Sequence, residues 1–145
     1  MIGDCSFLWS LIKEKVFMGQ RIVNLAIVVR DYDEAIQYYT EKVGFELVED
    51  LPMEPGKRWV VVRPPGSQAA LLLAKAKNQS QASRIGDQTG GRVFLFLETD
   101  QFDEDYERML AAGIHFTEEP RNEVYGKVVV WQDLYGNKWD LIGRK

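Results

Sequence analysis

The sequence contains an internal repeat, and this repeat restricts the possible fold more than any other feature. When the chain is shifted by about 70 residues, Gly66 aligns with Gly136 and Leu71 aligns with Leu141. Each half has the apolar pattern of a strand, a helix and three further strands. Two such βαβββ modules, related by a pseudo-twofold axis, would form a curved, barrel-like sheet around a cleft. The sequence therefore predicts an α+β fold.

The first module is predicted to cover residues 21 to about 78. Its first strand is the run rich in β-branched residues at 22–29, and an aspartate at 31 or 33 caps the helix that follows. Gly44 ends this helix, because glycine readily adopts the left-handed conformation. Three more strands are expected at residues 45–48, 59–63 and 69–74, separated by turns that contain proline and glycine.

A polar stretch separates the two modules. Residues 78–91 contain many serine, threonine and glycine residues and one large apolar residue, Ile85, so we interpret the stretch as a linker or mobile loop. The second module, from about 92 to 145, repeats the pattern of the first. Its helix is expected to be capped by residues 100–103, and its strands are expected at residues 93–97, 114–117, 127–131 and 138–142.

Residues 1–20 are expected to form an N-terminal extension, in which apolar side chains recur at roughly helical spacing. Asp4 and the lack of an early positive cluster argue against a signal peptide. An alternative is that the start site has been misassigned, because Met18 lies just before the first strand and the domain needs nothing that precedes it.

Composition limits the classes of partner. A chain of 145 residues is the size of one globular domain, and its only cysteine, Cys5, excludes an intramolecular disulfide, so we expect a cytoplasmic protein. The net charge is −4, with 22 acidic and 18 basic residues interspersed, which gives no basic stripe for nucleic acid. No apolar run approaches the roughly 18 residues of a membrane span, so no membrane partner is expected.

Two segments resemble a known family. NLAIVVRDYDEAIQYYTEKVGFELVED, at residues 24–50, is similar to the first strand and helix of the glyoxalase/bleomycin-resistance/dioxygenase superfamily, also called the vicinal oxygen chelate superfamily. VVVWQDLYGNKWDLI, at residues 128–142, resembles the strand, turn and strand that close its domain. The resemblance runs from about residue 21 to residue 142 and implies this fold, but one fold hosts many chemistries.

The resemblance also implies where a divalent metal would be held. The positions of the family's two histidines fall on Asn24 and Phe94, and those of its carboxylates fall near Ala70 and on Asp140. Only Asp140 is a strong ligand, and Asn24 can add one amide oxygen. Since the chain contains a single histidine, His115, it cannot supply the two-histidine sites of dioxygenases or of zinc enzymes. We therefore expect no metal cofactor; any ion would be held by Asp140 and Asn24.

The predicted strands are rich in aromatic residues, which suits a cleft for a flat or amphipathic organic ligand. For any single aromatic residue, packing in the core is the ordinary alternative. Arg63, at the end of a strand, can clamp a carboxylate or phosphate, or simply pair with a surface acid. The predicted ligand-binding cleft consists of Asn24, Phe94, Asp140, Trp59, Phe96, Trp131 and Arg63.

Two functions are consistent with these residues, and a purely structural or regulatory dimer is a third alternative. The first is a binding protein that resembles the bleomycin-resistance branch, holds a small organic molecule without the usual metal, and acts as a homodimer, as the resemblance implies. The second is a divergent glyoxalase-type lyase or isomerase that uses Asp140 and a weakly held divalent metal. No catalytic residue is assigned, and a dioxygenase is not expected.

Overall fold

The computed structural model describes residues 19–145, and most of the predicted N-terminal extension, residues 1–18, lies outside this part. The first module forms one sheet of four strands in the order β1-β4-β3-β2. Strands β1 and β4 are parallel, and the other neighbouring strands are antiparallel. The strands are β1 (Asn24–Val29), β2 (Glu46–Glu54), β3 (Lys57–Arg63) and β4 (Ala70–Lys75).

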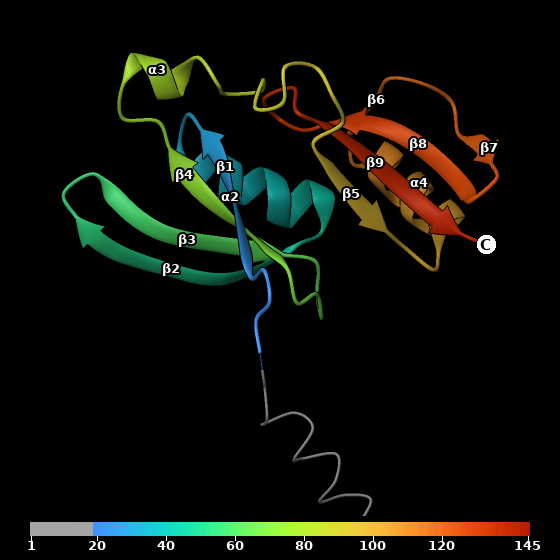
Figure 1. Cartoon of the computed structure of the whole chain (residues 1–145), viewed down its shortest axis with the longest axis horizontal. Coiled ribbons are helices and arrows are strands. Elements are labelled where there is room, and N and C mark those ends of the chain that lie inside the picture. The colour runs from blue at the N-terminus through green and yellow to red at the C-terminus, as the bar shows by residue number, and fades with distance from the viewer. Residues whose placement is uncertain (1–18) are drawn as a thin grey trace, which may run out of the picture.

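The second module forms the second sheet, in the order β5-β9-β8-β6, with β7 paired to the same strand, β8, as β6. Its parallel pair, β5 and β9, corresponds to β1 and β4 of the first sheet. The strands are β5 (Leu95–Glu98), β6 (His115–Phe116), β7 (Arg121–Glu123), β8 (Gly126–Gln132) and β9 (Lys138–Arg144). The predicted α+β fold of two modules is thus confirmed, but the two curved sheets do not close into one barrel (Figure 1).

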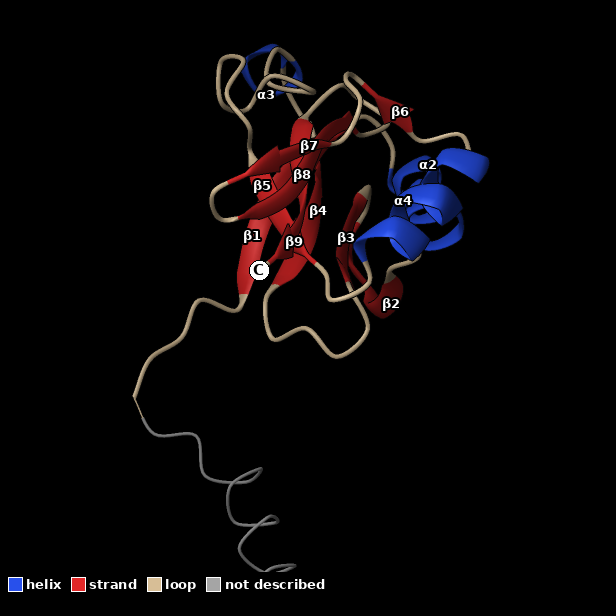
Figure 2. Ribbon diagram, turned by 90° about the vertical axis from the view of Figure 1, so that its right-hand side faces the viewer, coloured by secondary structure: helices blue, strands red, loops and turns tan. Residues whose placement is uncertain are grey.

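Two helical segments lie on one side of both sheets (Figure 2). One is the continuous helix of the first module, which is α-helical at α2 (Tyr32–Gln37) and widens to a π-helix at η1 (Tyr38–Val43). The other is α4 (Phe102–Ala111) of the second module. Within residues 19–145, no helix combines the length and apolar character needed to cross a membrane.

One hydrophobic core joins both modules on this helical side. It takes every second residue of the central strands, as the alternation of a pleated strand requires. The core side chains from the strands include Ile27, Val29, Val60, Val62, Leu71, Leu73, Val129, Trp131, Trp139 and Leu141. The intervening residues belong to the opposite faces of the two sheets, which we call the open faces. A ligand site built on the sheets is therefore expected on the open faces.

Several element boundaries differ from the predictions. Strand β2 continues through Pro52 to Glu54, although the sequence predicts an end at residue 48. Because β2 is an edge strand, the missing N–H of Pro52 is tolerated, and the strand register shifts beside it. Asp31 caps the first helix as predicted, with Oδ2 accepting a bond from the N–H of Glu34 at 2.9 Å. The second helix begins after Gln101, which lies within the predicted cap at residues 100–103 but makes no side-chain cap bond.

The stretch between the modules is packed against both of them. It contains a short helix, α3 (Gln79–Ala82), which the sequence did not predict. The side-chain amide of Gln88 accepts a hydrogen bond from the N–H of Val28 and donates one to the carbonyl of Ala26 at 3.1 Å. One glutamine thus occupies hydrogen-bonding groups on the free edge of β1. The interpretation of residues 78–91 as a linker or mobile loop is incomplete.

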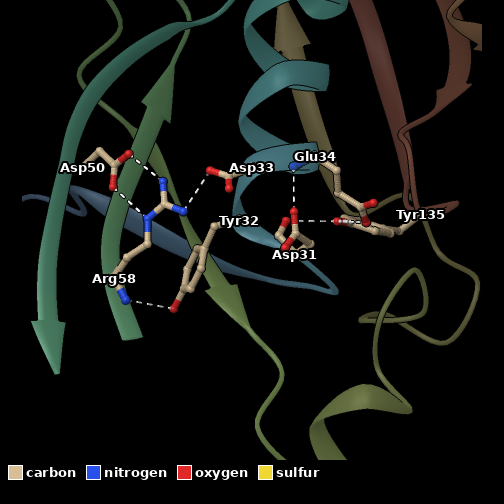
Figure 3. Close-up of polar contacts among 7 residues, drawn as sticks. All are labelled: Asp31, Tyr32, Asp33, Glu34, Asp50, Arg58 and Tyr135. Carbon is tan, nitrogen blue, oxygen red and sulfur yellow. Dashed lines mark hydrogen bonds and ion pairs between the residues drawn. The ribbon is translucent and has the colours of Figure 1, made fainter. Parts of the chain in front are cut away.

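Polar contacts tie the first helix to both sheets (Figure 3). Arg58 of β3 pairs with Asp50 of β2 at 2.7 Å and with Asp33 of α2 at 2.8 Å. On the side of the second module, the hydroxyl of Tyr135 donates to Glu34 of α2 at 2.8 Å. The Arg58 contacts hold the helix on the first sheet, and the Tyr135–Glu34 bond joins the two modules.

Candidate functional site

Asp140 lies in a recess on the open face of the second sheet. The recess has a volume of about 690 Å³. Its walls come from β5, β8 and β9 and from the loops before β5 and after β6. It is lined by Gly91, Arg92, Val93, Phe96, Thr117, Val130, Gln132, Lys138 and Asp140, and we call it the Asp140 recess.

The carboxyl group of Asp140 is buried without a complete set of partners. The residue is 7% exposed, and its Oδ1 atom has no hydrogen-bond partner. Burial raises the pKa of this carboxyl above its ordinary range, and the neighbouring charge of Glu118 adds to the rise. Arg121 opposes it. A buried carboxyl oxygen without a partner is rare in folded proteins, and such a group is a candidate for ligand contact.

The strand register identifies the residue that faces Asp140 across the parallel pair. Phe96 of β5 pairs with Asp140 of β9, just as Asn24 of β1 pairs with Ala70 of β4. Phe96 therefore occupies the position equivalent to Asn24, and the alignment that gave this position to Phe94 is wrong by two residues. Phe94 lies just before β5, where its N–H donates to the carbonyl of Lys138, and its side chain packs against the core.

Phe96 is 65% exposed although it is a large apolar side chain. It lines both the Asp140 recess and a second pocket of about 490 Å³, which lies between the two modules. The second pocket is lined mainly by apolar residues, among them Leu25, Phe45, Pro64, Pro65, Leu97 and Trp139. Phe96 of β5 thus lies between the Asp140 recess and the second pocket and lines both.

Two predicted cleft residues lie on the open face of the first sheet. Trp59 donates its indole N–H to the carboxylate of Glu49, and Arg63 pairs with Glu46 at 2.8 Å. Each side chain therefore already has an acidic partner on the neighbouring strand, which is the ordinary alternative considered for Arg63. Neither residue lines the Asp140 recess.

Trp131 is not a cleft residue. Its side chain is completely buried in the core, where its ring stacks on Trp139 with ring centroids 4.8 Å apart. A ligand on the open face cannot reach it, so the expectation that Trp131 lines the cleft is wrong. His115, by contrast, is an exposed residue at the start of β6, the strand that pairs with β8.

Sequence reasoning missed several residues that line the recess, namely Thr117, Val130, Gln132 and Lys138. Val130 and Gln132 belong to β8, where they alternate with the core residues Val129 and Trp131. The signal available in the sequence was the pairing of β8 with β9, because Val130 lies opposite Asp140 in that antiparallel pair. The uninterrupted apolar run of β8 hides which face each of its residues occupies.

The donor set does not fit the metal that the resemblance implies. Among residues 19–145, no group of three or more histidine, cysteine, aspartate and glutamate side chains is arranged to hold a metal ion. The two parallel pairs that correspond to the family's ligand positions contain Asn24 with Ala70 and Phe96 with Asp140. Alanine and phenylalanine supply no ligand atoms, and one carboxylate with one amide is too few donors for a firmly held ion.

Known proteins with similar sequences or structures place the chain in a family. A protein from Shewanella frigidimarina, whose function is not described, is 55% identical over 127 residues, covering 86% of this chain and 94% of that protein. A superfamily member from Sphaerobacter thermophilus has a crystal structure that matches with a TM-score of 0.74 and 28% identity, over 88% of this chain and 100% of the other.

A third similar protein is TnmS3, an antibiotic binding protein from a Streptomyces species. Its crystal structure matches with a TM-score of 0.72 and 26% identity, over 90% of this chain and 100% of that one. The family model described as Glyoxalase/Bleomycin resistance protein/Dioxygenase superfamily matches residues 21–141. With nearly the whole of the described fold covered by this match, the chain belongs to the glyoxalase/bleomycin resistance protein/dioxygenase superfamily.

Proposed function

We propose that the protein binds a small organic molecule in the Asp140 recess and that this binding needs no metal ion. One observation carries the proposal: a buried carboxyl oxygen without a partner lies directly across a strand pair from an exposed phenylalanine. A ligand that contacts both groups would satisfy the oxygen and cover the apolar ring. Both gains favour binding.

The dimensions and lining of the recess support a small ligand. A volume of about 690 Å³ falls within the range of roughly 300–1,000 Å³ typical of small-molecule sites. Apolar walls from Phe96, Val93 and Val130 combine with the polar groups of Thr117 and Asp140. Such a site gains affinity from apolar contact and orientation from a few polar groups.

The similarity to TnmS3 also supports a binding role, because that protein is an antibiotic binding protein. Its sequence identity to this chain is 26%. The similarity suggests the general class of activity, a protein that holds an organic molecule. It does not specify the molecule, since members of one fold bind different ligands.

The protein is further proposed to act as a homodimer. Both open faces lie on the side away from α2 and α4 (Figure 2), so they are available to a second copy. Phe96 is exposed on the second open face, and Leu51 is exposed on the edge strand β2 of the first sheet, with exposed fractions of 65% and 53%. A second copy placed over these faces would bury apolar area and deepen the recess.

The experiment is a binding screen combined with metal analysis. Protein purified without a histidine tag or chelator is analysed for metals, and a panel of small organic compounds is screened by the shift in thermal unfolding temperature. Hits are then measured by calorimetry with wild type, Asp140→Asn and Phe96→Ala. The control is Glu104→Gln, which makes the same neutralising change at an exposed position of α4.

The proposal expects a compound that binds metal-free protein and loses affinity in Asp140→Asn and in Phe96→Ala but not in Glu104→Gln. Near-stoichiometric metal that disappears in both Asn24→Ala and Asp140→Ala would overturn it. That result would favour the lyase or isomerase instead. A broad panel with no hits on a folded protein would also count against it.

A further inference from the structure

We infer that the ligand of the Asp140 recess carries a protonated amine beside an aromatic or alkyl body, with the ammonium group on Asp140 and the body on Phe96. This inference rests on the proposed function and specifies its ligand class. The basic groups near Asp140 already have other partners or lie in solvent, and an exposed phenylalanine lies across the strand pair from it.

No basic side chain of the recess neutralises Asp140. Arg121, whose positive charge acts on Asp140, is held by Glu118 at 2.6 Å and by Glu123 at 3.0 Å. Lys138 donates its ammonium to the carbonyl of Gly91 at 3.2 Å. The remaining basic residue of the lining, Arg92, is exposed. The buried Oδ1 of Asp140 is thus left without a partner.

A cationic donor is the chemical group best suited to supply the missing hydrogen bond to Oδ1 of Asp140. A hydrogen bond in which the donor or the acceptor is charged is about twice as strong as a neutral one, and an ammonium also brings a full opposite charge to the carboxylate. An anionic ligand would be repelled by Asp140 and by the nearby Glu118, whose carboxylate accepts bonds from the N–H of Val130 and from Arg121. A neutral hydroxyl can also donate to Oδ1, but it brings no opposite charge to compensate the buried carboxylate.

Phe96 supplies the second half of the recognition. It pairs with Asp140 across the parallel strands, so the two side chains leave the sheet on the same face at neighbouring positions. An ammonium held by Asp140 therefore lies close to an exposed aromatic ring, where a cation is attracted to the ring face. The carbon body attached to the amine can cover the same ring and exclude water from it.

The test uses three probes of similar shape that differ in charge: naphthylmethylamine, naphthylmethanol and naphthoate. Their dissociation constants are measured by calorimetry near neutral pH and at low salt with the full chain. The amine should bind at least tenfold more tightly than the alcohol, which corresponds to about 1.4 kcal/mol. The naphthoate should bind most weakly.

The variants separate the two contacts. Asp140→Asn, which keeps the shape of the side chain, should abolish the preference for the amine and lower the affinity for the alcohol much less, because the alcohol loses only the charge assistance of one hydrogen bond. Phe96→Leu should lower the affinity for the amine and the affinity for the alcohol by similar factors. Glu104→Gln, the exposed control on α4, should behave as wild type. Circular dichroism and thermal unfolding confirm that each variant is folded.

Equal affinity of the amine and the alcohol, or tighter binding of naphthoate, would overturn the inference and leave the proposed binding function standing. An amine preference that survives in Asp140→Asn would also overturn it. Failure of all three probes overturns this ligand class, whereas failure of the proposed function needs the broad panel to fail as well.

Discussion

The hydroxyl of Tyr39 in the first module donates a hydrogen bond to Oδ2 of Asp133 in the second module, at 2.6 Å. Tyr39 is completely buried, and Asp133 is 6% exposed. Asp133 also organises the turn between β8 and β9, because its carboxylate accepts bonds from Asn137 and from the N–H of Tyr135. One bond thus joins the π-helical segment η1 to the turn that positions β9 and Asp140.

The first prediction removes this bond. Tyr39→Phe should lower the free energy of unfolding by about 1–2 kcal/mol, because a buried carboxylate loses one of its donors. Urea denaturation gives the change. The matched control is Tyr38→Phe, whose hydroxyl makes only a long contact of 3.4 Å to the carbonyl of Gln132 and should matter less. Equal effects of the two substitutions would contradict the importance assigned to the Tyr39–Asp133 bond.

The second prediction concerns the stretch between the modules. Gly86 has a φ of +76°, and a Cβ atom there would lie 1.9 Å from the carbonyl oxygen of Tyr135. Gly86→Ala must therefore displace backbone that belongs to the turn between β8 and β9. Gly90 has a similar φ of +67° but no atom within 4 Å of its added Cβ, so Gly90→Ala reports the backbone strain alone.

Both alanine variants should be less stable than wild type by about 1 kcal/mol from the left-handed backbone conformation. Gly86→Ala should lose clearly more because of the clash, with a lower thermal unfolding temperature than Gly90→Ala. If the two variants unfold at the same temperature, the stretch from 78 to 91 behaves as the linker or mobile loop that the sequence suggested.

The third prediction concerns the ion pairs of Arg58 (Figure 3). Arg58 bonds to Asp50 through two nitrogen atoms, reaches Asp33 at 2.8 Å, and lies over the ring of Tyr32 at 5.2 Å from its centroid. Arg58→Gln should lower the free energy of unfolding by up to about 1 kcal/mol, since the pairs are partly exposed to solvent. The effect should shrink in high salt.

The hydrogen bond from Arg58 lowers the pKa of Asp50 below its ordinary value. This shift determines how the stabilisation by the pair depends on pH. The stabilisation is fully present above the pKa of unfolded aspartate and is lost as the pH falls through the lower pKa of the folded state. Denaturation of wild type and Arg58→Gln should therefore converge in acid. Arg30→Gln, which breaks the exposed pair of Arg30 with Glu34, is the control and should have the smaller effect.

The fold was predictable because each module repeats strong local signals. Asp31 caps the first helix, and Gly44 ends it with a φ of +92°. The repeat was not sufficient to fix the strand register. The number of residues between Asn24 and Ala70 differs from the number between Phe96 and Asp140. A single shift of about 70 residues, applied to the whole first module, therefore aligns Asn24 with Phe94 and not with Phe96. Only hydrogen bonding between distant strands determines that register.

The site was predictable in part. Asp140 follows a core tryptophan and precedes a core leucine in β9, so the alternation of the strand already places it on the other face. Trp131 lies in a strand that is apolar on both faces, where alternation gives no information. The pairing of Trp59 and Arg63 with acids on β2 depends on tertiary contacts, which the sequence does not specify.

The last prediction tests the state of Asp140 in the absence of ligand. Because burial raises the pKa of this carboxyl, the folded protein holds the proton to higher pH than the unfolded chain does. Stability should therefore decrease as the pH rises from the unfolded pKa of about 4 to the higher folded value. Above that window the ionised, unpartnered carboxylate remains a constant cost. Asparagine carries no such charge, so Asp140→Asn should be more stable than wild type near neutral pH.

The expected gain is on the order of 1 kcal/mol, which is the low end of the cost of a buried polar group without a partner. The gain in stability should disappear below about pH 4, where Asp140 of the wild type is protonated and therefore as neutral as the asparagine of the variant. Urea denaturation of wild type, Asp140→Asn and the exposed control Glu104→Gln across this pH range measures it. A destabilised Asp140→Asn at neutral pH would mean that the carboxylate has a stabilising partner in the free protein. The expected result, a variant that is more stable but binds the amine probe less tightly, would identify Asp140 as a residue whose burial is costly for folding and useful for ligand binding.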